Sequence, residues 1–181
     1  GGVYLYRVDA VARRLVALEA SSFRVDLRPS GIALYRGQGG RTYCFVNGAD
    51  PAAGAEGVVE QWELAFGAER VAAERVRRFV VGGRVEGCVC DDANGFLFVS
   101  EEKVAVWRYG AEPGAGEGRT LVERVGLSGR LRTNAEGLAP TAAATCSCPA
   151  RARTTSPSTS AGRRTPTAAA SASPRARSST P

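Results

Sequence analysis

The chain has 181 residues and a formal net charge of +6, from 24 basic and 18 acidic side chains. This length allows one domain of ordinary size. The chain contains no histidine, which excludes Ser-His-Asp and Cys-His nucleophile systems, histidine metal ligands and phosphohistidine chemistry. No apolar run approaches the length of a membrane span and no signal peptide is visible, so we expect no membrane contact.

The excess positive charge lies at one end of the chain. Residues 140–181 contain six arginines and no acid, so the 18 basic residues of 1–139 balance the 18 acidic ones. A nucleic-acid groove needs its charge on a folded face. We therefore predict a charged tail and no nucleic-acid partner.

Strand patterns dominate the chain up to residue 139. Residues 71–81 include the run AERVRR, which has helical propensity, but the valines and the phenylalanine around it favour an outer strand. Asn94-Gly95 stands between two β-rich runs and predicts a hairpin, because both residues tolerate positive φ. In chain order the expected strands are 3–8, 13–18, 31–36, 41–47, 58–64, 71–81, 84–90, 96–100 and 104–109.

These strands repeat along the chain. Equivalent glycines are spaced 56 and 50 residues apart, and equivalent aromatic residues 56 and 45 apart: Gly31, Gly87 and Gly137, and Tyr6, Trp62 and Trp107. Such a period, with about four strands per unit, is typical of propeller blades. A β-sandwich would not normally repeat its acid and aromatic positions in this way. We predict an all-β fold, a β-propeller fragment with about two complete blades and parts of two more.

Five cysteines occur, and none has the C-x-x-C spacing of a zinc knuckle: Cys44, Cys88, Cys90, Cys146 and Cys148. Cys44 and Cys88 fall at inward-facing strand positions. A free thiol there behaves as a small apolar residue, so we predict core thiols rather than disulfides or metal ligands.

The composition changes at Pro140. Residues 140–181 are almost entirely Ala, Ser, Thr, Pro and Arg, with no aromatic residue, so this segment is predicted to be a disordered tail beside a propeller domain at 1–139. Regrouping the possible codons of residues 145–159 by one nucleotide permits a strand-like sequence. A frameshift product and a true linker both remain open, and the first is favoured.

Four motifs, in order and with their spacing, resemble those of the β-propeller phytases. They are FVNG…GVVEQWEL (45–64), VEGCVCDD (85–92), LFVSEEKVAVWRYGAEPGAGEGRTLVERVG (97–126) and AEGLA (135–139). The resemblance implies a six-bladed propeller, of which the chain covers the middle portion. It also implies a calcium-dependent hydrolase of myo-inositol hexakisphosphate (phytate) that is secreted or periplasmic, and monomeric when complete.

The resemblance assigns roles to four glutamates. Glu86 and Glu136 match the Glu of the xEG motif, which binds calcium at the axial end of an inner strand. Glu102 matches another calcium ligand, and Glu101 lies beside it. The predicted calcium ligands are therefore Glu86, Glu101, Glu102 and Glu136, and the predicted catalytic residues are Glu86, Glu102 and Glu136.

The expected chemistry needs neither histidine nor a covalent nucleophile. Calcium prefers six to eight oxygen ligands, which a cluster of glutamates supplies. The bound ions would attract phosphate oxygens and lower the pKa of a coordinated water, which would attack phosphorus in line.

The sequence departs from the family pattern at two substrate positions. Ser30 stands where a tyrosine is usual, and Ala49 where a phosphate-binding lysine is usual. Lys103, the only lysine, matches no family phosphate ligand. We expect this chain by itself to be inactive or nearly so, because other blades contribute to the family site. A non-catalytic ligand-binding or partner-binding propeller and another calcium-dependent propeller hydrolase, such as a lactonase, are the alternatives; calcium binding and a substrate panel separate them.

Overall fold

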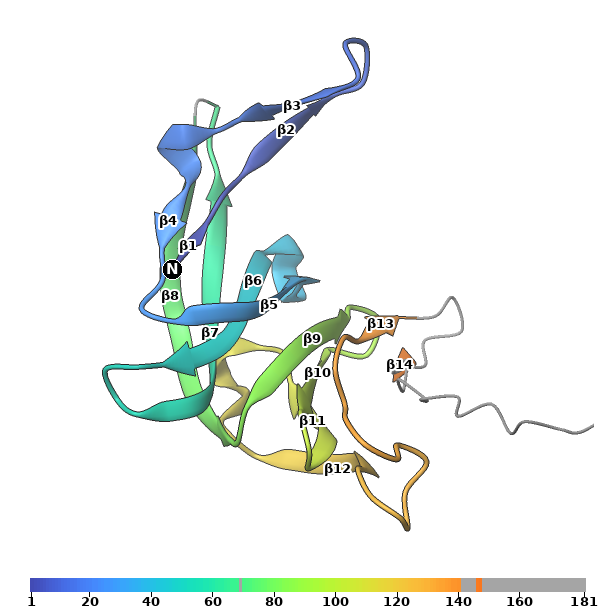
Figure 1. Ribbon diagram of the computed structural model, residues 1–181. Coiled ribbons are helices and arrows are strands. Elements are labelled where there is room, and N and C mark those ends of the chain that lie inside the picture. The colour runs from blue at the N-terminus through green and yellow to red at the C-terminus, as the bar shows by residue number, and fades with distance from the viewer. Residues whose placement is uncertain (69, 141–145, 148–181) are drawn as a thin grey trace, which may run out of the picture.

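The computed structural model describes residues 1–68, 70–140 and 146–147. Apart from three 3-10 turns, the regular elements of this part are all β-strands. Two consecutive four-stranded antiparallel sheets form its centre (Figure 1). The first blade is β5 (Arg28–Arg36), β6 (Thr42–Asp50), β7 (Ala55–Phe66) and β8 (Val71–Gly82); the second is β9 (Val85–Asp91), β10 (Phe96–Glu101), β11 (Ala105–Gly110) and β12 (Arg119–Arg124). The predicted all-β fold with blade-like sheets is confirmed.

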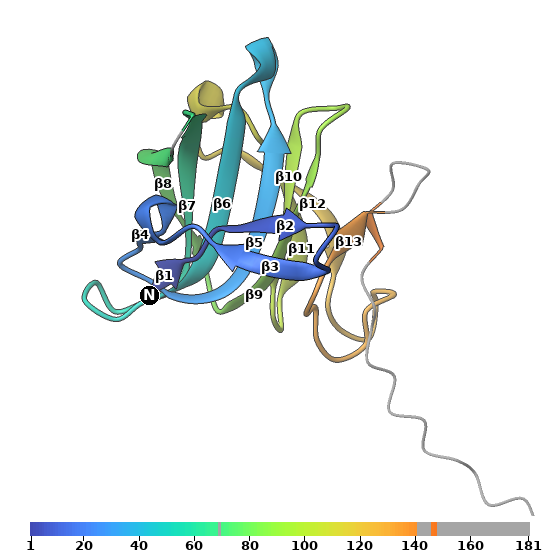
Figure 2. The same cartoon turned by 90° about the horizontal axis from the view of Figure 1, so that it is seen from above.

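Within each blade the strands follow one another as a meander, and neighbours in sequence are neighbours in the sheet. The view in Figure 2 shows the first-blade strands side by side, with the second blade against them. The choice of a strand for residues 71–81 is confirmed, since β8 pairs with β7 from Val71 opposite Phe66 to Gly82 opposite Gly57. Cross-strand pairing along this length overrides the helical propensity of AERVRR.

The N-terminal residues differ from the expected pattern. The strand predicted at 3–8 is divided into β1 (Gly2–Val3), which pairs with β4 (Phe23–Arg24), and β2 (Tyr6–Asp9), which pairs with β3 (Arg14–Ala17). The chain changes partner between these strands, where the Leu5 carbonyl accepts a hydrogen bond from the Leu18 amide at 2.8 Å. The β2–β3 hairpin projects from the first blade (Figure 1). The 3-10 turn Glu19–Ser21 follows β3.

The fourth strand of the second blade was not delimited from the sequence. Strand β12 reads RTLVER and is mostly exposed, and its apolar residues do not alternate with polar ones. Edge strands carry charged side chains that discourage pairing with other chains. This makes them hard to distinguish from loops, and the same holds for the 3-10 turns Gln38–Gly40 and Pro113–Ala115.

The largest apolar core lies between the two blades. The first blade contributes aromatic residues, among them Tyr43, Phe45 and Phe79, and the second contributes Leu97 and Tyr109. The rings of Phe79 and Tyr109 lie 4.8 Å apart between centroids. The opposite face of the first blade is covered by the N-terminal segment, in a second cluster of Val3, Val25, Leu27, Cys44, Val46, Val58 and Leu64. The central strands of the first blade, β6 and β7, are therefore buried on both faces, as strands stacked between layers require.

The thiol prediction is confirmed for the two cysteines that it named as inward-facing. Cys44 and Cys88 are free and buried, and Cys90 is free and half-buried. Burial raises the pKa of the Cys44 and Cys88 thiols to about 12. They are therefore neutral at physiological pH and pack as apolar residues.

Polar contacts also connect the blades at their outer strands. Arg77 on β8 donates from Nη1 to the carbonyls of Gly110 (2.9 Å) and Glu112 (3.2 Å) and from Nη2 to Gly116. Burial lowers the pKa of this guanidinium. Gln61 adds a 2.8 Å hydrogen bond from Nε2 to the Ala111 carbonyl. These bonds fix the loop after β11 against the first blade.

Most of the predicted tail at 140–181 lies outside the described residues. Within it, β14 (Cys146–Ser147) pairs with β13 (Ala139–Pro140). No helix among residues 1–68, 70–140 and 146–147 is long and apolar enough to span a membrane.

Candidate functional site

The repeated glycines of the sequence form a contiguous row in space. A Cβ atom built on Gly31 would lie 3.1 Å from the Gly87 Cα, and one built on Gly87 would lie 3.2 Å from the Gly137 Cα. Only glycine permits backbones to approach so closely. The residues that precede these glycines, namely Ser30, Glu86 and Glu136, are therefore carried by adjoining segments of backbone.

Three of the predicted site residues lie at one end of the second blade, and we call Glu86, Glu102 and Glu136 the glutamate rim. Glu86 is the second residue of β9, and Glu102 follows the last residue of β10. These ends coincide because the strands are antiparallel, with Ser100 opposite Gly87. Glu136 lies in the segment between β12 and β13.

Backbone hydrogen bonds connect the three parts of the glutamate rim. The Glu102 amide donates to the Arg84 carbonyl at 2.8 Å, and the Ala135 amide donates to the Glu102 carbonyl at 2.8 Å. The Ser100 hydroxyl donates to the Glu136 carbonyl at 2.5 Å, and its oxygen lies 3.2 Å from the Gly87 carbonyl oxygen. Segments far apart in sequence are thus held side by side.

The rim carboxylates are partly open to solvent. Glu86 forms an ion pair with Arg84 at 2.6 Å, and Glu102 lies 3.8 Å from the Lys103 ammonium. The side chains of Glu86 and Glu102 are 22% and 19% exposed. Across the part of the chain that the structure describes, no group of three or more His, Cys, Asp or Glu side chains has the proximity of a metal site.

Glu101, the fourth predicted ligand, differs from these three. Its side chain is only 6% exposed. Its Oε1 accepts a hydrogen bond from the Gly83 amide and its Oε2 accepts one from the Trp107 indole, both at 2.6 Å. Arg119 lies 3.8 Å from the same carboxylate. Protein groups therefore engage both oxygens of Glu101.

The two departures from the family pattern lie in the first blade. Ser30 donates to the Val85 carbonyl at 2.6 Å and accepts from Asn47 Nδ2 at 2.9 Å. The Ser30 hydroxyl thus connects the first blade to the start of β9. Ala49 is half-buried and lies opposite Arg28 on β5.

Asn47 and Ser100 were not identified from the sequence. They occupy equivalent positions, opposite Gly31 and Gly87. Ser100 bonds directly to Glu136, whereas Asn47 bonds to Ser30 of its own blade, and the Ser30 hydroxyl reaches Val85. The Asn47 Oδ1 atom is buried and has no hydrogen-bond partner within the described residues. The available signal was a polar residue that ends the apolar run of the second strand in both repeats, FVN and FVS.

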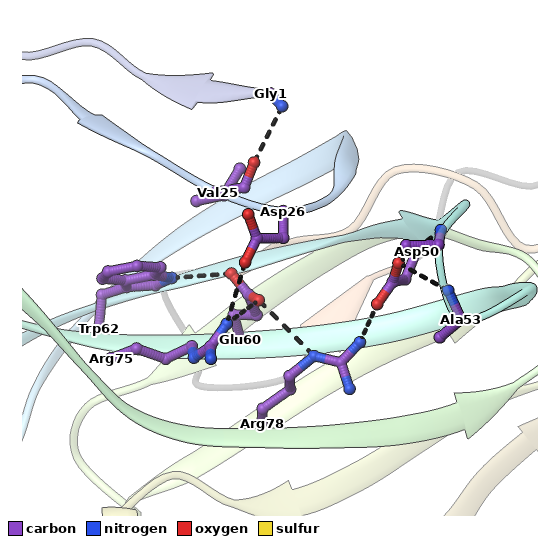
Figure 3. Close-up of polar contacts among 10 residues, drawn as sticks. Gly1, Val25, Asp26, Asp50, Ala53, Glu60, Trp62, Arg75 and Arg78 are labelled. Atoms are coloured by element: carbon purple, nitrogen blue, oxygen red, sulfur yellow. Dashed lines mark hydrogen bonds and ion pairs between the residues drawn. The ribbon is translucent and has the colours of Figure 1, made fainter.

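A buried acid in the first blade was also missed. Glu60 is fully buried and accepts hydrogen bonds from Arg75 Nη1 at 2.8 Å and from Trp62 Nε1 at 3.2 Å (Figure 3). Arg78 lies 3.7 Å from Glu60 and also pairs with Asp50. Charges within the blade balance this acid, so it is a structural group rather than a binding site.

Known proteins resemble this chain over most of its length. A model of the family described as Phytase matches residues 5–146. The 3-phytase of Bacillus subtilis (strain 168) is 30% identical over 141 residues, which cover 75% of this chain and 35% of that protein. The chain therefore spans about a third of the length of this relative.

Proposed function

Since the chain belongs to the phytase family, we propose that it carries part of a calcium-dependent site that hydrolyses phosphate monoesters of phytate. The observation that supports this most directly is the glutamate rim, where three segments of backbone meet. The 3-phytase relative supports the substrate class. A secreted or periplasmic location and a monomeric complete protein belong to the same proposal.

We assign calcium binding, and with it the catalytic role, to Glu86, Glu102 and Glu136. Carboxylates are the hard oxygen donors that calcium prefers. Asn47 Oδ1, which is buried and has no hydrogen-bond partner among the described residues, is a neutral oxygen donor at the neighbouring position of the row. Calcium bound there would supply positive charge for phosphate oxygens and lower the pKa of a coordinated water. The residues of the chain hold the donors in place through the Glu102 and Ala135 backbone bonds.

The ion pair of Glu86 bears directly on this function. Arg84 Nε lies 2.6 Å from Glu86 Oε1, so the guanidinium competes with any cation for that oxygen. Arg84 is 66% exposed and can turn toward solvent or toward an anionic phosphate. We expect Arg84→Ala to strengthen calcium binding several-fold.

The proposal is tested by calorimetric titration of the 181-residue chain with calcium chloride. We expect a dissociation constant of about 10⁻⁴ to 10⁻³ M, the range of open extracellular sites. Glu86→Gln and Glu136→Gln should each weaken binding about tenfold or more. Glu63→Gln, which removes an acid paired with Arg41 elsewhere on the first blade, is the matched control. Equal affinities for all four proteins would contradict the assignment.

Activity is measured separately, as phosphate released from phytate with calcium present. We expect little or no release by this chain, because it spans 35% of its relative and has Ser30 and Ala49 at the two substrate positions. Release at the rate of a complete phytase would show that the expected inactivity is wrong. Calcium binding without hydrolysis by a longer form of the protein would favour a non-catalytic binding module.

A further inference from the structure

We propose that Glu101 is a positioning residue for the glutamate rim, and that it acts through Gly83 and Trp107 instead of binding calcium. This inference rests on the proposed function, calcium binding by the glutamate rim. The contacts that carry it belong to the protein without calcium, so they are testable independently.

The first argument is that the Glu101 carboxylate is already engaged on both sides. The Gly83 amide and the Trp107 indole donate to different oxygens at 2.6 Å, and the side chain is 6% exposed. Hydrogen bonds to a charged group are among the stronger ones in proteins. A calcium ion would have to displace one of these donors from its charged acceptor, which is unfavourable.

The second argument comes from the connection between the blades. Gly82 has a φ of +139°, and a Cβ atom there would lie 2.8 Å from Glu101 Oε1; one on Gly83 would lie 3.2 Å from the same atom. The backbone between β8 and β9 therefore curves closely around this carboxylate, and the positive φ favours glycine at position 82.

The third argument is that this connection leads directly to the rim. Gly83 is followed by Arg84, whose carbonyl accepts the Glu102 amide, and then by β9 with Glu86 at its second position. The Glu102 carbonyl in turn accepts the Ala135 amide. The hydrogen bond to the Gly83 amide thus positions the start of β9, which carries Glu86, and the turn that carries Glu102. The segment that carries Glu136 is bonded to this turn.

Arg119 strengthens the same unit. Its guanidinium carbon lies 3.9 Å from the centroid of the Trp107 ring, and Nη1 donates to the Val81 carbonyl at 2.5 Å. Val81 lies near the end of β8, so the fourth strand of the second blade is bonded to the last strand of the first. Glu101, Trp107 and Arg119 together hold the blade junction from which the rim begins.

The test compares Glu101→Gln and Trp107→Phe with the unchanged chain, and uses Glu63→Gln as the control. Amide hydrogen exchange at Gly83 and Glu102 is measured without calcium, and calcium affinity by titration. Glu101→Gln replaces one carboxylate oxygen, which accepts a hydrogen bond, with an NH₂ group, which cannot accept one. The Phe variant removes the indole donor and keeps an aromatic ring, and neither Trp nor Phe offers calcium an oxygen. Thermal unfolding identifies a variant that does not fold, in which case the other one decides.

We expect Gly83 exchange to accelerate roughly tenfold or more in both variants, and calcium affinity to fall in both. If Glu101→Gln weakens calcium binding while Gly83 exchange is unchanged and Trp107→Phe binds normally, Glu101 is a ligand and the inference is wrong. Unchanged exchange in both variants also overturns it. If the unchanged chain binds no calcium, the proposed function fails, while accelerated exchange still establishes the positioning role.

Discussion

Each blade carries a tryptophan on its third strand, Trp62 or Trp107, but the two blades satisfy the indole N–H groups with acids from different places. In the first blade Trp62 donates to Glu60, two residues earlier on the same strand. In the second blade Trp107 donates to Glu101 at the end of the neighbouring strand. Each acid also lies near an arginine of the fourth strand, Arg75 or Arg119.

This difference separates an acid that lies within its own sheet from one that lies beside the glutamate rim. Because Asn47 and Ser100 are equivalent in register, Glu101 and Glu102 occupy the positions of Gly48 and Ala49. The acid of the first blade lies within its sheet and is balanced there. Glu101, the acid of the second blade, lies beside the turn that carries Glu102. It therefore accepts the hydrogen bond of the indole, as Glu60 does in the first blade, and in our proposal it also positions the rim.

The largest effect is expected from Glu60→Ala. The substitution removes the buried partner of Arg75, one of the two buried partners of Arg78 and the acceptor of Trp62, so the free energy of unfolding should fall by about 3 kcal/mol or more. Urea unfolding measures this. Glu63→Ala, which removes an exposed ion pair on the same strand, should cost under about 1 kcal/mol. Equal losses for the two variants would refute the structural role of Glu60.

The next effect concerns the row of glycines. A Cβ on Gly87 would lie 3.0 Å from the Glu136 carbonyl oxygen, whereas one on Gly137 would meet no atom within 4 Å. We expect Gly87→Ala to lower the free energy of unfolding by about 1–3 kcal/mol and to weaken calcium binding, because backbone at the rim must move. Gly137→Ala, at the equivalent repeat position, should change stability far less. Similar losses at both would mean that the row does not constrain the rim.

How much of this the sequence predicts can be seen at particular residues. The repeat of Gly31, Gly87 and Gly137 predicted blades, and the structure places these glycines in contact. Apolar, β-rich runs bounded by turn residues identified most strands, because the central strands of the first blade are buried on both faces and read as continuous apolar runs. Strand β12 was missed because this exposed edge strand has no such run.

The chemistry of the site was less accessible than the fold. The resemblance of the motifs predicted four glutamates as ligands. Only the three-dimensional contacts show that Glu101 is buried, whereas Glu86 and Glu102 are partly open to solvent. A carboxylate that accepts a hydrogen bond from an indole and one that is partly open to solvent look the same in a sequence. The partners that distinguish them, Gly83 and Trp107, are 18 and 6 residues away from Glu101.

A smaller effect is expected from Arg77→Lys at the outer contact of the blades. A single ammonium cannot reach the carbonyls of Gly110, Glu112 and Gly116 together, as the guanidinium does. The free energy of unfolding should fall by about 1–2 kcal/mol. Calcium affinity should stay unchanged, because this contact lies on the outer strands rather than at the rim. The exposed Arg36→Lys is the control, and weakened calcium binding in Arg77→Lys would show that the outer contact also shapes the site.

The smallest effect at neutral pH comes from the thiols that the two blades bury, Cys44 in the first and Cys88 in the second. Folding raises the pKa of each from an ordinary 9.0 to about 12. Above pH 9 the unfolded chain loses these protons and the folded chain keeps them, so the folded state binds more protons and its stability falls as pH rises. The stabilisation is complete below pH 9 and is lost by about pH 12, at up to about 1.4 kcal/mol per pH unit for each thiol. Urea unfolding between pH 8 and 11 should therefore show a slope that Cys44→Ala and Cys88→Ala each reduce by a similar amount, whatever they cost at pH 7. A slope reduced by only one variant would mean that the blades bury their thiols unequally.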